Sequence, residues 1–421
     1  MRHALGFAAL FAALTATPAM AQELTVWDWK SGDPVTSGYF AKVKADFEAA
    51  HPGVTVKYVM QPHDQYYTLL GTALSSAGGP DLILLHGGAQ ARERVGAMVK
   101  LDDKVADIRG DIKGWEEFTG KDGAVYAVPL SIQGFVVYYN KTLYKNAWLD
   151  PESPPRTWNE LKKACDAIKA KGDVPCFTLG NKEGFGAEFF FSSMAANSFS
   201  DAEQAEWAAG KLKWSSPQVK AILQAWVDTQ AWGWYAEGAN STAKFMDEYE
   251  AFMRGEGANT IGLISDVAHW KQFDEFLGAE NVGVFKPLSP TLASDKKTDD
   301  LKFPLSGGIG YAVNNKSPNA NLAIDLAKAF AAPAAMQVFF HDAGAIAANT
   351  KVDTSTLASP SAKAIIGWMA TSGAPTAHTN MTTAEIEEWH RQSQLLLNGA
   401  VTVDAAAARM DEVQAQARAG R

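Results

Sequence analysis

Polar side chains stand at the ends of four strand-like segments of the chain. Trp29 and Ser31 follow the first segment, His86 follows "LILL", Gln133 interrupts a long run of strand formers, and Asp266 follows "IGLIS". Hydrogen-bonding groups beside an indole ring suit the binding of a small ligand, because the ring offers an apolar face while the polar groups fix orientation. In open α/β sheets ligands bind beyond the carboxyl ends of the strands, so these side chains would converge if two lobes faced one cleft.

The chain shows no motif spacing typical of catalysis. It has no phosphate-binding loop, no nucleophile elbow and no His-Glu-x-x-His zinc motif. Its carboxylate pairs, such as Glu387 with Glu388, are adjacent, and adjacent residues do not face each other as an acid/base couple must. The histidines are scattered, and we expect His378 and His390 at the surface. We expect no metal and no cofactor. A catalytic pair assembled from two carboxylates that are far apart in the sequence stays open as an alternative.

Alternating strand and helix patterns must position these residues. Residues 23–29, 54–60 and 80–85 favour strands, and amphipathic helices are expected between them, at 37–50 and 65–77. This order is typical of an α/β lobe whose parallel strands are covered on both faces.

A second α/β set begins near residue 135. Its first long helix is opened by Thr157 and Glu160 as a capping box and ended by Gly172, and a strand is expected at 175–180. We expect Trp270 to pack under a helix. The remaining expected elements are a helix from 244 that stops at Gly255, strands at 259–264 and 307–315, two helices that flank Pro333, and a last helix at 405–419.

The composition fits a globular protein of two to three domains. The chain has 421 residues, of which 47% are hydrophobic and 20% charged. A formal net charge of −9 argues against nucleic acid or an anionic membrane as the main partner, since neither attracts a net anion. The 13 tryptophans offer many flat apolar faces for a ligand or for the core.

Residues 1–21 have the features of a secretory signal peptide. Arg2 and His3 precede an apolar run, and small residues at Ala19 and Ala21 predict cleavage after Ala21. No cysteine follows this position, so no lipid anchor is expected, and no later run is apolar and long enough to insert into a membrane. We therefore expect an exported, soluble protein.

Cys165 and Cys176 are the two cysteines of the chain. In an oxidising compartment a pair this close predicts a disulfide, which would tie the helix opened by Thr157 to the segment after it. The alternative is two buried free thiols.

The stretch "KDGAVYAVPLSIQGFVVYYNKTLYKNAWLDPESPPRTWNELKKACDAIKAKG" (residues 121–172) resembles the extracellular solute-binding proteins of ABC importers, in the carbohydrate-binding family that includes the maltose-binding proteins. It carries a Gly-x-x-Tyr-x-x-Pro turn, a strand that ends in Tyr-Asn, and a Pro-x-Thr-Trp helix start. "FEAAHPGVTVKYV", "GGPDLILL", "FMRGEGANTIGLIS" and "GGIGYAVNNKSPNANLAIDLAKAF" are similar to further family blocks, in the same order.

The resemblance implies a two-lobe periplasmic-binding-protein fold, each lobe a mostly parallel sheet flanked by helices, joined by crossing hinge strands. The N-terminal lobe would comprise residues 22–131 and 284–332, and the C-terminal lobe residues 135–282 and 336–421. Residues 131–135 would be the first crossing, with Gln133 turned into the cleft and Gly134 giving hinge freedom. The alternative for Gln133 is a strand glutamine satisfied by neighbouring backbone.

The resemblance also implies which residues face the ligand. Trp29 is followed by "KSGD", which lacks the Asp-Lys pair of the maltose binders, so a malto-oligosaccharide is not the expected ligand. Trp232 and Trp234 would stack on the ligand or serve as core and surface. The full expected set is Trp29, Ser31, Gly32, His86, Gln133, Asn181, Glu183, Phe185, Trp232, Trp234, Ser265, Asp266, Gly307 and Gly308.

The function implied is that of a periplasmic, monomeric carrier that binds a mono- or oligosaccharide between its lobes and delivers it to the membrane permease subunits of an ABC importer. The faces of a pyranose ring lie flat on indole, and its hydroxyls need paired donors and acceptors. Two alternatives stay open: a secreted carbohydrate-active enzyme, and the same carrier role for a non-sugar ligand such as a glycerophosphodiester.

Overall fold

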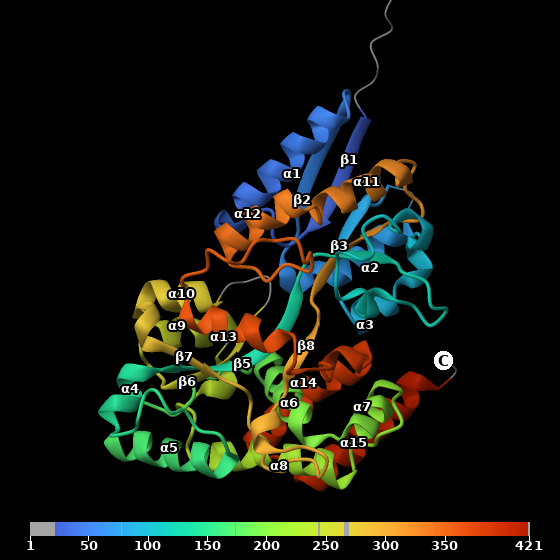
Figure 1. Cartoon of the computed structure of the whole chain (residues 1–421). Helices are drawn as coiled ribbons and strands as arrows, with labels where there is room; N and C mark the ends of the chain where they lie inside the picture. The colour runs from blue at the N-terminus through green and yellow to red at the C-terminus, as the bar shows by residue number, and fades with distance from the viewer. Residues whose placement is uncertain (1–21, 77, 173, 243–244, 265–268, 420–421) are drawn as a thin grey trace, which may run out of the picture.

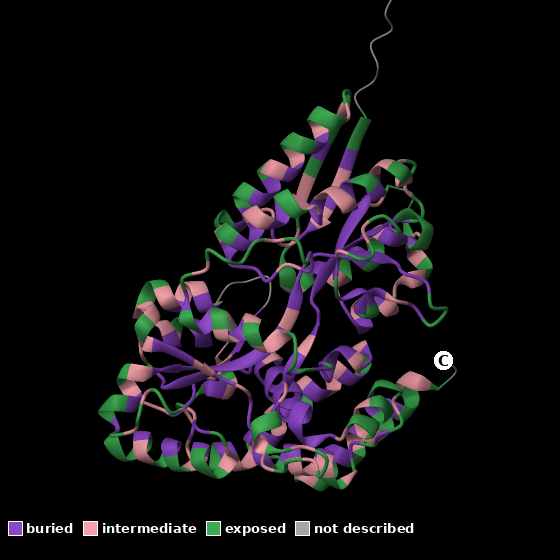
Figure 2. Ribbon diagram, viewed as in Figure 1, coloured by how far each residue is buried: buried purple, intermediate pink, exposed green. Residues whose placement is uncertain are grey.

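The computed structural model of the chain describes residues 22–419 except 77, 173, 243–244 and 265–268 (Figure 1). Within these residues the chain forms two lobes, each built around one sheet with helices packed against it. Buried residues follow the strands of both sheets, while the exposed positions lie on the outer faces of the helices (Figure 2). The two-lobe periplasmic-binding-protein fold predicted from the sequence is confirmed.

The first sheet has the strand order β2-β1-β3-β9-β4. Its central strand pairs are parallel, because β1 runs parallel to both β2 and β3, whereas β9 is antiparallel to β3 and to β4. The strands are β1 (Gln22–Asp28), β2 (Val54–Met60), β3 (Leu82–His86), β4 (Ala127–Pro129) and β9 (Ile309–Val313), and the main helices of this lobe are α1 (Ser37–Ala50), α2 (Tyr66–Ser75), α3 (Ala89–Arg92), α11 (Ala320–Phe330) and α12 (Pro333–Ala343).

The second sheet has the order β10-β8-β5-β6, and β7 also pairs with β5. The strands are β5 (Ile132–Asn140), β6 (Asn259–Leu263), β7 (Val282–Phe285), β8 (Phe303–Gly307) and β10 (Gly373–Ala374). The helices of this lobe are α4 (Lys141–Asn146), α5 (Trp158–Lys171), α6 (Phe185–Ser198), α7 (Asp201–Ala208), α8 (Pro217–Ala231), α9 (Phe245–Met253), α10 (His269–Leu277), α13 (Pro360–Met369), α14 (Thr383–Leu397) and α15 (Val403–Arg418).

The sheets are mixed rather than mostly parallel. In the second sheet β5 is antiparallel to β6, β7 and β8, whereas the short β10 pairs in parallel with β8. The strand expected at residues 175–180 is reduced to a bridge between Phe177 and Asn259. The expected capping of α5 is found in part: the Thr157 side chain accepts from the Glu160 N–H, but the Glu160 carboxylate accepts from Arg156 N–H instead of closing the box.

Two crossing segments run side by side between the lobes. Residues 131–134 pair with residues 305–308, through Ile132 with Gly307 and Gly134 with Leu305. A third segment joins them, because the Ala348 N–H donates to the Leu130 carbonyl. A Cβ built at Gly134 would lie 2.2 Å from the Pro304 carbonyl oxygen, so this position requires glycine for close strand packing and not only for hinge freedom.

These crossings lead us to propose lobe boundaries that differ from those expected. Residues 282–307 pair with the second sheet through β7 and β8, although residues from 284 onward were expected in the first lobe. α12, expected to belong mainly to the second lobe, packs on α1 in the first, with the rings of Tyr39 and Phe339 stacked 4.6 Å apart. We place residues 22–131 and 308–353 in the first lobe and the remaining described residues in the second.

Candidate functional site

A cluster of aromatic rings covers the carboxyl ends of β1 and β3 in the first lobe. Trp29 directly follows β1, and its indole stacks on the imidazole of His86, the last residue of β3, with centroids 4.5 Å apart. Tyr66 meets Trp29 edge-on at 4.8 Å, and the Tyr67 hydroxyl lies 2.8 Å from Nδ1 of His86. The register that aligns β1 with β3 brings these rings together, as expected for Trp29 and His86.

The Asp28 side chain stabilises the loop after β1. This carboxylate is fully buried, and its Oδ1 accepts the backbone N–H groups of Lys30 and Ser31. Burial raises the pKa of Asp28, although those two N–H donors oppose the shift. Ser31 is therefore half-buried beside the cluster, and the exposed Gly32 adjoins the Met60 side chain.

One ring from the second lobe, that of Phe185, meets this cluster. Phe185 is the first residue of α6, and its ring lies 6.2 Å from that of His63, which itself lies 5.3 Å from Trp29. Gln133 is half-buried in the first crossing segment, where it pairs with Ser306. Within the described residues the Gln133 side chain makes no hydrogen bond to protein, so its amide is available to a ligand.

A buried carboxylate with two imidazoles lies behind Phe185. Glu188 Oε1 contacts Nε2 of His390 directly, and Oε2 lies 3.6 Å from Nε2 of His378. Burial alone would raise the pKa of Glu188, but the two imidazoles bring it below its ordinary value, whereas burial lowers the pKa of His378. The expectation that both histidines lie at the surface was wrong: His378 is buried and His390 is 23% exposed.

The contact of Ser192 with His378 and that of His378 with Glu188 resemble the contacts between a catalytic nucleophile, its base and an orienting acid. The Ser192 hydroxyl lies 2.9 Å from Nδ1 of His378. Ser192 is 0% exposed, however, and its oxygen also accepts the His378 backbone N–H. A substrate does not reach a hydroxyl in this position, so the arrangement is a packing network and not an active site.

Trp232 and Trp234 do not lie at the site. Trp234 is buried against Trp158 at 5.3 Å and Phe177 at 5.5 Å, and the Trp232 carbonyl accepts from Nζ of Lys169 in α5. Both tryptophans therefore stabilise the packing of α5 at the far end of the second lobe. The local sequence Trp-Gly-Trp does not show this, because the partners come from elsewhere in the chain.

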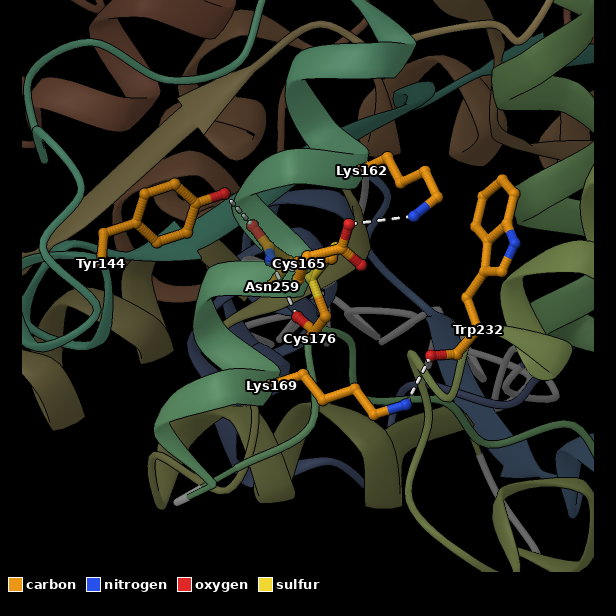
Figure 3. The surroundings of a disulfide bond; sticks show 8 residues. Tyr144, Lys162, Cys165, Lys169, Cys176, Trp232 and Asn259 are labelled. Atoms are coloured by element: carbon orange, nitrogen blue, oxygen red, sulfur yellow. Dashed lines mark hydrogen bonds and ion pairs between the residues drawn. A yellow bond between two sulfur atoms is a disulfide. The ribbon is translucent and has the colours of Figure 1, made fainter.

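The disulfide lies in the same region (Figure 3). Cys165 and Cys176 are bonded, with Cα atoms 5.1 Å apart, so the prediction of a disulfide is confirmed. Asn259 supports the bridge, because its Nδ2 donates to the Cys176 carbonyl at 2.8 Å and its Oδ1 accepts from the Tyr144 hydroxyl. The bridge thus ties α5 to the segment beside β6, within one lobe.

The remaining expected residues divide into four groups. Asn181 is fully buried and bonded to Asn240 and Ser393, so it supports the α6 loop and does not face a ligand. Gly307 and Gly308 lie in the second crossing segment, where a Cβ at either would collide with its neighbours. Glu183 is half-buried near Phe185, and Ser265 and Asp266 lie outside the described residues.

The sequence reasoning missed His63, Tyr67 and His390. Their signal was weak, since single aromatic residues after a proline or inside a helix are common. Among the residues that the structure describes, no group of three His, Cys, Asp or Glu side chains is arranged to hold a metal ion. No single described helix is long and apolar enough to span a membrane; the bent pair α11 and α12 passes that test together, by length and composition only.

A polar interface joins the lobes beside the aromatic cluster. The Arg92 guanidinium donates to the Thr379 carbonyl at 3.2 Å and to Glu117 at 2.9 Å, and the Thr379 hydroxyl donates to the same carboxylate. Burial raises the pKa of Glu117 to about 7, against the attraction of Arg92. These contacts fix the relative position of the lobes in this structure.

Curated proteins with similar sequences are binding proteins. A binding protein of Brucella abortus is 30% identical over 166 residues, which is 36% of this chain and 36% of that protein, so the match spans about a third of its length. The maltodextrin-binding protein of Bacillus subtilis is 25% identical over 332 residues, 74% of this chain and 70% of that protein. The sn-glycerol-3-phosphate-binding periplasmic protein of Brucella abortus is 39% identical over 59 residues, 14% of each chain.

Solved structures share the fold over nearly the whole chain. A chitin oligosaccharide binding protein superposes with a TM-score of 0.84 at 23% identity, covering 95% of this chain and 100% of that one. An ABC transporter solute binding protein from Thermotoga lettingae, bound with α-D-tagatose, gives 0.74 at 19% identity over 93% and 100%. A sugar transporter protein from Bacillus licheniformis, in complex with stachyose, gives 0.73 at 18% identity over 93% and 98%.

The family model of bacterial extracellular solute-binding proteins matches residues 32–337. That range runs from the loop after β1 to α12 and includes Gln133, Phe185 and both crossing segments. The chain therefore belongs to the bacterial extracellular solute-binding protein family.

Proposed function

We propose that this protein binds a mono- or oligosaccharide between its lobes, in the periplasm, and delivers it to the permease subunits of an ABC importer. The observation that carries the proposal is the contact between aromatic rings of the two lobes: Phe185 lies 6.2 Å from His63, which adjoins both Trp29 and His86. The half-buried Gln133 lies in the first crossing segment between the lobes. Flat rings suit the C–H faces of a sugar, and the amide suits its hydroxyls.

The similar proteins support this ligand class. A maltodextrin, a chitin oligosaccharide, tagatose and stachyose are named with relatives or structural neighbours of the chain. The relative that binds sn-glycerol-3-phosphate supports a second candidate ligand, a phosphate ester, for the same carrier role. We propose further that the protein acts as a monomer and without catalysis.

A thermal-shift screen tests the proposal directly. Chitotriose, stachyose, maltotriose and sn-glycerol-3-phosphate are added separately, and hits are measured by calorimetry. A ligand at about 100 times its dissociation constant adds roughly 2.7 kcal/mol of stability. Saturable one-to-one binding of a sugar, without release of reducing ends, supports the carrier; turnover supports an enzyme, and binding of sn-glycerol-3-phosphate alone rejects the sugar.

A further inference from the structure

A set of hydrogen bonds, which we call the clasp, joins side chains of the first lobe to one segment of the second. The first lobe contributes the end of α3, the residue after it and the turn Trp115–Phe118, and the second lobe contributes the segment that leads into α14. The residues of the clasp are Arg92, Glu93 and Glu117 with Thr379, Asn380 and Thr383. Every atom of the clasp belongs to the protein, so its contacts do not require a ligand.

Glu93 and Thr383 form the part of the clasp at the start of α14. Thr383 is the first residue of this helix; its backbone N–H donates to Oε1 of Glu93 at 3.2 Å, and its hydroxyl donates to Oε2 at 2.7 Å. The first N–H groups of a helix have no partner within that helix, and a negative charge is favourable at this end. A carboxylate of the first lobe therefore caps a helix of the second lobe.

Arg92 forms the second part of the clasp. Its Nη1 donates to the Thr379 carbonyl at 3.2 Å, while Nη2 donates to Oε2 of Glu117 within the first lobe at 2.9 Å. The Thr379 hydroxyl donates to the other oxygen of Glu117 at 3.3 Å. The backbones also meet here, because Gly88 has a φ of +78° and a Cβ at this position would lie 2.4 Å from the Thr379 carbonyl oxygen. The two lobes thus approach each other here more closely than a larger residue would allow.

The second-lobe side of the clasp is held in place by its own lobe. Arg418, the last residue of α15, donates to the Asn380 carbonyl at 2.9 Å and pairs with the buried Glu385 at 2.9 Å. Glu385 also completes the capping box of Thr382 at the start of α14. Because this segment is ordered by its own lobe, the contacts with the first lobe form without the cost of ordering it.

We propose that the clasp is a conformational device that favours the closed arrangement of the lobes independently of the ligand. Rotation of the lobes about the crossing segments separates α3 from the start of α14, and a hydrogen bond is lost once its donor and acceptor are more than about 3.5 Å apart. Contacts of the protein itself therefore stabilise the closed arrangement, and a ligand that binds this arrangement adds to a bias that is already present. The identity of the ligand does not enter this inference, so its test uses the protein alone.

The distance between the lobes, measured without ligand, tests the proposal. Asp103→Cys and Glu206→Cys introduce one cysteine at an exposed position of each lobe, and nitroxide labels attach there because the native cysteines are bonded to each other. Double electron–electron resonance then gives the distribution of distances between the labels, in which the closed arrangement is the shorter distance. Thr383→Val keeps the shape of the side chain but removes its hydroxyl. It should raise the ratio of open to closed protein by about fivefold, the effect of one hydrogen bond.

Glu93→Ala is the second variant and tests the same contact from the other lobe. It removes both acceptors of Thr383, so it should open the lobes further than Thr383→Val does. Adding Thr383→Val to Glu93→Ala should open them no further, because the hydroxyl acts through Glu93. Thr142→Val is the matched control: Thr142 also lies in the first turn of a helix, α4, but its hydroxyl donates to Asn281 of the same lobe. The control should leave the distribution of distances unchanged.

The outcomes separate a clasp from a contact that persists when the lobes open. Thermal melting of each labelled variant first shows that it is folded. Distance distributions that are identical in the unmodified protein, Thr383→Val and Glu93→Ala would overturn the proposal. A double variant that opens distinctly further than Glu93→Ala, or a control that opens as far as Thr383→Val, would overturn it as well. Because no ligand is added, a failure of all sugars to bind would reject the proposed carrier function and leave the result on the clasp standing.

Discussion

Trp29 and His86 stack with their ring centroids 4.5 Å apart and their planes inclined by 20°. The two rings come from the carboxyl ends of β1 and β3, which are neighbouring parallel strands. Strand register thus creates a rigid aromatic surface without any local sequence motif. Phe185 approaches the same surface from the other lobe through His63, so a ligand held there contacts both lobes.

The first prediction concerns Trp29. Trp29→Ala should weaken sugar binding by about 2 kcal/mol, or roughly 30-fold, because aromatic anchors dominate the energy of contact sites. Trp29→Phe should recover part of this loss, since a smaller ring remains. Trp148→Ala is the control: its side chain is 90% exposed, and we expect unchanged calorimetric affinity. A Trp29→Ala variant that binds normally would place the sugar elsewhere.

The second prediction concerns Gln133. Gln133→Ala should reduce affinity by about 1–3 kcal/mol, or roughly 5- to 150-fold, because ligand hydroxyls lose their partner. The unliganded protein should melt at the same temperature, since the side chain makes no hydrogen bond within the described residues. The calorimetric affinity and the melting temperature, measured on one preparation, distinguish a ligand-binding role of Gln133 from a role in the strand. Lower melting with unchanged affinity would show that Gln133 serves the strand instead.

The third prediction concerns the movement of the lobes. Three chain segments connect the lobes, and a ligand between them should draw the lobes together. Small-angle scattering should give a smaller radius of gyration with saturating sugar than without it. Identical scattering curves at saturation would reject closure, although not binding itself.

The sequence predicted what depends on local pattern and missed what depends on distant partners. The end or interruption of a strand can be recognised where a run of strand-forming residues stops. Trp29, His86 and Gln133 could therefore be selected from the local sequence pattern. The contact of His390 with Glu188 could not be predicted in this way, because the two residues are 202 positions apart in the sequence. The choice between a ligand-stacking and a core role for Trp234 stayed open for the same reason: its stacking partners Trp158 and Phe177 are set by the packing of α5.

The lobe boundaries also depend on contacts between distant parts of the chain, which the local sequence does not show. The helix that begins at Pro333 was expected mainly in the second lobe, and its packing on α1, which includes the stacking of Phe339 on Tyr39, leads us to place it in the first. The mixed order of the second sheet likewise follows from the return of β8 along β5, a pairing between distant segments.

The fourth prediction concerns the disulfide. Free-thiol titration of denatured, unreduced protein should find no reactive cysteine, because Cys165 and Cys176 are bonded. Cys165→Ala combined with Cys176→Ala should lower the free energy of unfolding by roughly 2–3 kcal/mol, as expected for a short loop. Sugar affinity should persist, since the bridge lies at the far end of one lobe. Lost affinity at temperatures where the variant is folded would contradict this separation.

The last prediction concerns Glu248, a fully buried acid on α9. Burial raises its pKa to about 8, although it accepts hydrogen bonds from the Gly180 N–H at 2.8 Å and the Thr260 hydroxyl at 3.3 Å. In the unfolded chain the pKa is near the ordinary 4.5. Between these two values the folded protein keeps a proton that the unfolded chain has released.

The sign of the pH dependence follows from this difference. Where the folded state binds more protons than the unfolded state, stability falls as pH rises. The contribution of Glu248 is therefore fully present below about pH 4.5 and is lost as pH rises through about 8. Glu117, with a pKa of about 7, adds a decline of the same sign over a narrower range.

Glu248→Gln should flatten this decline, because a neutral amide keeps the Gly180 contact without ionising. Urea unfolding at intervals from pH 5 to pH 9 should show the unmodified protein losing stability with rising pH, and Glu248→Gln losing distinctly less. Glu250→Gln on the same helix is the control, since Glu250 is exposed and should leave the profile unchanged. Parallel profiles for Glu248→Gln and the unmodified protein would mean that Glu248 is already ionised in the folded state at neutral pH.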